Sequence, residues 1–148
     1  VTYAPAALAR AQDALARMQT ELTAKKYDKV KTLALEASAA AEKAGTEALA
    51  NKEKVKADAA ALIAAMGKKV PDVEKTVSAA RRIRNTGLNF TAIAQSLSDA
   101  KASLAAAAND NANGDFMAAW TKASGVQTAL ANTEQSVATA VQAATKRK

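Results

Sequence analysis

The side chains in this sequence best suited to chemistry are basic, and they fall in three groups. Cations at this density bind phosphates or an acidic polymer through charge, with an affinity that falls as salt rises. Aromatic residues make up only 3% of the chain, so stacking on nucleobases is not available and a polyanion would be bound without base recognition. The alternative is a solvated helix face in which Glu53 and Asp58 pair with nearby lysines. The candidate residues are Lys52, Lys54, Lys56, Arg81, Arg82, Arg84, Lys146, Arg147 and Lys148.

Other kinds of chemistry find no support in the residue types. The chain has no cysteine and no histidine, which excludes Ser-His-Asp and Cys-His catalysis as well as thiolate and imidazole metal sites. The spacing Asn109-x-Asn111-x-Asn113-Gly114 resembles a calcium loop, but its twelfth position is Trp120 where such loops need a bidentate glutamate. We therefore expect no enzyme, no cofactor, no metal site and no small-molecule substrate.

One pair of aromatic residues is a candidate anchor for a protein partner. Trp120 is the only tryptophan and follows Phe116 by about one helical turn, so both can lie on one side of a helix. Tryptophan is enriched in binding hot spots. The alternative is that both rings pack at one end of a helical bundle.

The elements that must position these residues are helices. Alanine accounts for 42 of the 148 residues, and apolar residues recur at the 3-4 spacing of a helix face, as in Leu8, Ala11, Leu15, Met18 and Leu22. Start and stop signals (Pro5, Asp28, Gly67 with Pro71, and Asp115) divide the chain further. The sequence predicts helices over residues 5–24, 28–66, 71–108 with a break near 85–89, and 115–145.

An internal repeat supports two helical hairpins. The segment from Leu8 to Leu15 matches the segment from Leu97 to Leu104 at an offset of 89 residues, and the same offset places Tyr27 on Phe116 and Ala34 on Ala123. Each copy reads as a helix, a tight turn and a second helix.

Short turns between long helices predict an all-α fold, an elongated antiparallel up-down-up-down four-helix bundle that forms a single domain over residues 1–148. We expect the larger apolar residues, including Leu15, Leu22 and Leu130, to supply most of its stability. A turn at 67–70 would bring Lys52, Lys54 and Lys56 level with the arginines at 81–84, with the basic residues 146–148 close by.

The N-terminal part of the chain resembles a known family. The start Tyr3-Ala4-Pro5, the turn Lys26-Tyr27-Asp28-Lys29-Val30 and the helical segment Ala41-Glu42-Lys43-Ala44 resemble the domain of unknown function 4398, over about the first 65 residues. The resemblance implies an alanine-rich helical protein of the bacterial envelope, of a kind often exported as lipoproteins. It implies no catalytic residues and no substrate.

Two functional hypotheses follow. The first is a non-enzymatic helical scaffold or adaptor of the bacterial cell envelope, which binds a protein partner or itself. The alternative is a polyanion-binding protein that uses the basic residues for DNA, anionic lipid or acidic polysaccharide. The longest apolar run, from Ala59 to Met66, is too short to span a membrane. We expect a periplasmic or extracellular location with the signal peptide removed, and a cytoplasmic location stays open.

Overall fold

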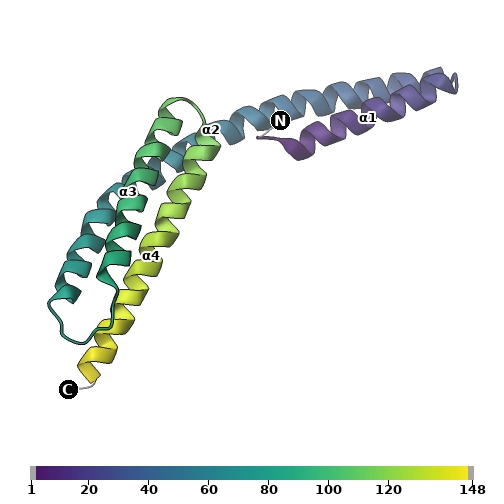
Figure 1. The fold of residues 1–148 in the computed structure, drawn as a ribbon. Helices are drawn as coiled ribbons and strands as arrows, with labels where there is room; N and C mark the ends of the chain where they lie inside the picture. The colour runs from purple at the N-terminus through teal and green to yellow at the C-terminus, as the bar shows by residue number, and fades with distance from the viewer. Residues whose placement is uncertain (1–2, 147–148) are drawn as a thin grey trace. The chain divides into compact units, whose positions relative to one another are not determined.

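The computed structural model describes residues 3–146, and within them the chain is helical with no strand. Four helices follow one another: α1 (Pro5–Thr23), α2 (Tyr27–Arg81), α3 (Phe90–Ala112) and α4 (Phe116–Lys146) (Figure 1). The all-α fold class is thus confirmed. The residues group into two compact units, one ending at Lys54 and the other beginning at Val55. A single four-helix domain with up-down-up-down order stays a prediction.

The predicted turn at residues 67–70 is wrong. Helix α2 continues through Gly67 and includes Pro71, although proline lacks the N–H that would bond to the carbonyl four residues earlier. Pro71 lies on the exposed side of the helix, while Met66, Val70 and Val73 are buried and stay in helical phase across it. An uninterrupted buried face therefore outweighs the local cost of the proline.

Helix α2 ends instead at Arg81, and residues 82–89 form the connection to α3, where the sequence predicted only a break inside a helix. Asn85 and Gly87 have positive φ angles of 62° and 68° there. Asn89 then caps α3, since its side-chain oxygen accepts a hydrogen bond from the Ala92 backbone N–H at 3.0 Å. Residues 71–81 therefore belong to α2, and the predicted helix over 71–108 is corrected to α3 alone.

The first unit is a hairpin of α1 and the beginning of α2, and it packs almost entirely through alanine. The Asn51 side-chain amide donates a hydrogen bond of 2.8 Å to the Tyr3 carbonyl, which holds the start of α1 against α2. Leu15 and Leu22, which the sequence placed in the core, are 46% and 50% exposed. Its buried apolar residues are Ala4, Ala7, Ala11, Ala14, Leu33, Ala37 and Ala44.

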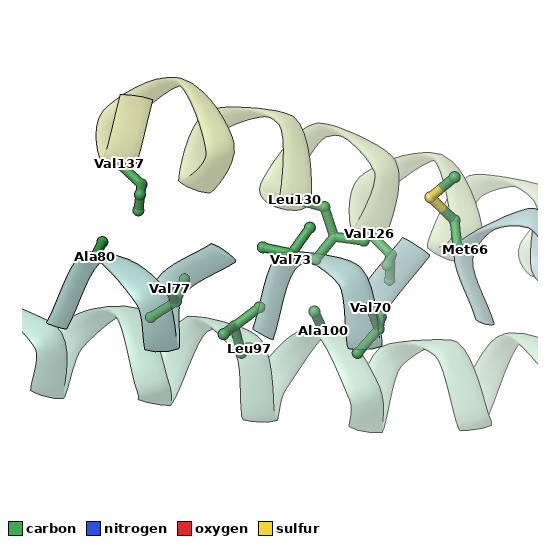
Figure 2. Close-up of a cluster of buried hydrophobic side chains, with 10 residues drawn as sticks. All are labelled: Met66, Val70, Val73, Val77, Ala80, Leu97, Ala100, Val126, Leu130 and Val137. Atoms are coloured by element: carbon green, nitrogen blue, oxygen red, sulfur yellow. The ribbon is translucent and has the colours of Figure 1, made fainter. Parts of the chain in front are cut away.

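The second unit has a core of larger side chains drawn from three helices. The end of α2 contributes Val73, α3 contributes Leu97 and α4 contributes Leu130, which is 1% exposed. Figure 2 shows these side chains pointing toward one another between the helices. The full set of buried residues in this cluster is Met66, Val70, Val73, Val77, Ala80, Leu97, Ala100, Val126, Leu130 and Val137.

The two hairpin turns have the same construction, 89 residues apart. After α1, the Lys26 N–H bonds to the Glu21 carbonyl at 3.0 Å; after α3, the Asp115 N–H bonds to the Asp110 carbonyl at 2.9 Å. This six-to-one bond is the mark of a Schellman turn. Its left-handed residue is Lys25 (φ 57°) in the first turn and Gly114 (φ 85°) in the second. The internal repeat of the sequence thus corresponds to a repeated local structure.

Candidate functional site

Within the second unit, the structure does not bring Lys56 together with the predicted arginines. Lys52, Lys54 and Lys56 lie on α2, as Arg81 does, so no turn folds the first group back on the arginines. Within the second unit, the helical rise separates Lys56 from Arg81 by about 38 Å. Arg147 and Lys148 lie outside the described residues.

Four of the basic residues remain near one end of the second unit, and we call them the basic end: Arg81, Arg82, Arg84 and Lys146. All four are exposed. Leu88 in the 82–89 loop and Val141 on α4 pack against the same core cluster, so the end of α4 lies beside this loop, as Figure 1 shows. The Arg81 guanidinium stands over the Phe90 ring, 5.3 Å from its centroid.

The basic end is poor in carboxylates: Glu74 shares surface grooves with Arg81 and Arg82, but it pairs with Lys101. The sequence has no Asp or Glu from residue 75 to residue 98, and none after Glu134. In the second unit lysines pair with acids, as in Lys69–Glu134 at 2.8 Å and Lys101–Glu74 at 2.6 Å. The basic end is therefore a local excess of positive charge.

The two candidate anchor residues are placed differently. Phe116 is 9% exposed and packs in the interior, with the Lys56 ammonium 5.9 Å from its ring centroid. Trp120 is 43% exposed on α4. Of the pair, only Trp120 offers a ring to the surface. The polar segment before it also differs from the expected loop, because residues 109–112 complete α3.

The exposed apolar side chains concentrate in the first unit, and this feature was missed from the sequence. Among the described residues, the other large hydrophobic side chains that stand exposed besides Trp120 all belong to this hairpin. Leu8, Leu15 and Leu22 recur every seven residues on α1 and so form one stripe. The exposed set in the hairpin is Leu15 46%, Leu22 50%, Tyr27 66%, Leu35 67% and Leu49 70%.

The hairpin has one polar side and one apolar side. Arg10 and Arg17 of α1 share a surface groove with Glu36 of α2. The residues of α1 that face α2 include Ala7, Ala11 and Ala14, and we call such positions the contact line. Each leucine of the stripe comes one residue after a contact-line position, which is a rotation of about 100° around the helix. The leucine stripe therefore lies on the flank of α1 opposite to Arg10 and Arg17. By the same geometry α2 adds a stripe of smaller residues to this side. We call the combined surface the leucine face: Leu8, Leu15, Leu22, Tyr27, Ala34, Ala41 and Ala48.

The repeat shows what covers the equivalent face in the second unit. At an offset of 89, Leu8, Ala34 and Ala41 correspond to Leu97, Ala123 and Leu130. Leu97, Ala123 and Leu130 are at most 6% exposed. Leu97 and Leu130 pack in the core together with residues 66–80 of α2. In the first unit Ala34 and Ala41 are exposed. The same hairpin face is thus covered by a third helix in one copy and left open in the other.

Comparisons with known proteins add no relative: no family model, curated protein or solved structure matches the chain. The resemblance to the domain of unknown function 4398 stays a prediction. Within residues 3–146, no helix is long and apolar enough to cross a membrane. In the same residues, no three acidic side chains gather where they could hold a metal ion.

Proposed function

We propose that this protein is a non-enzymatic helical scaffold that binds an apolar helix on the leucine face of its N-terminal hairpin. The observation that carries the proposal is the contrast between the two repeats, in which one face is buried under α2 and its counterpart exposes Leu15, Leu22 and Tyr27. Contiguous apolar patches on a soluble protein mark interaction sites.

The energetics of the hairpin support a partner. A contact line of alanines removes little apolar surface from water, so the hairpin gains little stability from its own packing. Covering the exposed half of Leu15 or Leu22 would contribute about 1 kcal/mol each. A partner helix would thus strengthen the unit that is weakest alone.

The proposal takes the helices of each hairpin as antiparallel. The tight turn at Lys25 and the bond from Asn51 back to Tyr3 support this direction for α1 and α2. We further propose that the protein acts in the cell envelope, in the periplasm or outside the cell. The resemblance of its N-terminal part to an envelope family supports this location.

Site-specific photo-crosslinking in the host cell tests the docking face. A photoreactive amino acid at position 15 should give adducts with a protein. The same amino acid at position 35 should not, because Leu35 lies two residues past the contact-line residue Leu33 and points away from the leucine face. Equal adducts at both positions, or none at position 15, would contradict the proposal.

A second function is favoured by the local excess of positive charge at the basic end of the second unit. Three arginines and Lys146, beside a Glu74 that pairs with Lys101, would bind a polyanion such as DNA, anionic lipid or acidic polysaccharide. The double variant Arg82→Glu/Arg84→Glu should lose affinity for a labelled DNA duplex at low salt. The control Lys29→Glu/Lys31→Glu makes the same change in net charge on α2 in the first unit and should keep the affinity. Undetectable binding by the unmodified protein would rule the function out.

A further inference from the structure

We propose that the helices covering the leucine face belong to a second copy of this chain, so that two N-terminal hairpins form one four-helix bundle. This inference rests on the proposed function, since it uses the same face. It names the occupant, which the proposed function leaves open.

The leucine face carries large side chains on one helix and small ones on the other. Counting from the turn at Lys25, Ala34 lies within about one residue of the level of Leu15, and Ala41 within about one residue of the level of Leu8. Leucine therefore stands beside alanine at these two levels, whereas Leu22 stands beside Tyr27 next to the turn. Such a surface offers both a ridge and a groove.

A two-fold axis along the hairpin makes this face complementary to itself. The rotation places α1 of one copy over α2 of the other and keeps each level unchanged, so Leu15 of one copy meets the level of Ala34 in its partner. Large residues opposite small ones allow layers to interdigitate at native density. Each helix then has antiparallel neighbours, as in an ordinary four-helix bundle, and the contact uses the same patch on both copies.

The size of the face suits a specific dimer. A helix of 19 residues is about 28 Å long, and two packed helices are about 20 Å wide. The two copies would then bury roughly 1,100 Å² in total, above the roughly 1,000 Å² that a specific interface needs.

The borders of the face contain no opposed like charges. The outer edge of α1 beside the leucines carries Gln12 and Gln19, and the outer edge of α2 carries Lys31, Ser38 and Gly45. In the dimer the glutamines of one copy face the α2 edge of the other. A basic edge on α1 would instead have faced Lys31 of the other copy and disfavoured this pairing.

Sedimentation equilibrium of the full chain tests the inference. The unmodified protein should show a mass that rises with concentration toward that of two chains. Leu15→Glu should raise the dimer Kd at least about thirtyfold, because each dimer loses two leucines and covering the exposed half of one is worth about fivefold. Leu35→Glu is the matched control: it makes the same substitution at nearly the same level on the outer side of α2, and it should leave the Kd unchanged.

A second variant covers the case in which Leu15→Glu reduces helicity measured by circular dichroism. Ala34→Gln fills the groove while keeping a good helix former on an exposed position, and it should also raise the Kd at least tenfold. A monomer at every concentration, or a dimer broken by Leu35→Glu and not by Leu15→Glu or Ala34→Gln, would overturn the inference. A monomeric protein whose position 15 still crosslinks to a different protein would overturn the second copy alone and leave the proposed function standing.

Discussion

At the scale of single residues, the two hairpin turns differ at the position that needs a left-handed backbone. Gly114 adopts φ 85° without steric cost, whereas Lys25 holds φ 57° with a Cβ. Both positions carry the same Schellman hydrogen bonds. The first turn is therefore strained in a way that the second is not.

Replacing Lys25 with glycine should stabilise the N-terminal hairpin. Relief of the left-handed strain is partly offset by the greater freedom of glycine in the unfolded chain, which leaves a gain of about 0.5–1 kcal/mol. Urea denaturation followed by circular dichroism measures the change. Lys29→Gly, inside α2, is the control and should lower stability by about 1 kcal/mol. An unchanged midpoint for Lys25→Gly would show that the turn is not strained.

The spacing of single residues explains why the leucine face was not predicted from the sequence. Leu8, Leu15 and Leu22 keep helical spacing with Ala11 and Met18, so they looked like one core stripe. The structure instead turns α1 so that Ala7, Ala11 and Ala14 meet α2. Periodicity defines an apolar arc on a helix, but the number of neighbouring helices decides how much of that arc is buried. Within the first unit α1 has one neighbouring helix, and the leucines stay exposed or half-buried.

At the scale of elements, α2 shows where local signals lose to packing. Gly67 followed by Pro71 is a typical helix end, yet the helix runs on to Arg81. The positions of other ends could be predicted, including the start at Pro5 and the turn near Lys25, and the break predicted near 85–89 falls in the loop that follows α2. Those turns lack a buried stripe that crosses them in phase, whereas Gly67 and Pro71 sit within one. The predicted turn at 67–70 also led to the predicted contact between Lys56 and the arginines at 81–84. That contact required the chain to fold back between them, and α2 instead continues through both Lys56 and Arg81.

Replacing Pro71 with alanine should stabilise the second unit. The substitution restores the backbone hydrogen bond to Gly67 and removes the clash of the ring with its carbonyl, which is worth about 1–3 kcal/mol. The fluorescence of Trp120, which lies in this unit, should follow the shift in urea denaturation. Asp72→Ala, one position later on the exposed surface, controls for surface substitution and should change stability little. A lower midpoint for Pro71→Ala would mean that the structure needs the proline.

At the scale of the whole molecule, the two units should differ in local stability. The first packs through alanines and the second through Val73, Val126, Leu130 and Val137, each at most 2% exposed. Hydrogen exchange read by mass spectrometry should therefore be at least about tenfold faster in α1 than at the centre of α4. Uniform exchange along the chain would contradict this difference.

The same hydrogen-exchange experiment, repeated at several protein concentrations, tests whether a second copy covers α1. A ligand that binds the folded form slows exchange by mass action, so concentration should slow exchange in α1 if a second copy covers it. Residues 119–137 of α4, whose buried side chains belong to the core of the second unit, should not respond and serve as the internal control. Slowing in both units alike would point to association by another surface.

The coverage of one repeat by α2 also sets the valence of the molecule. A chain with two open hairpin faces could be joined at both and would polymerise. Because the face of the C-terminal repeat is filled from within the chain, each molecule offers one such face, and a pair that joins through it leaves none over. Assembly through this surface would therefore stop at two molecules, because the end of α2 already fills the second face and prevents further growth.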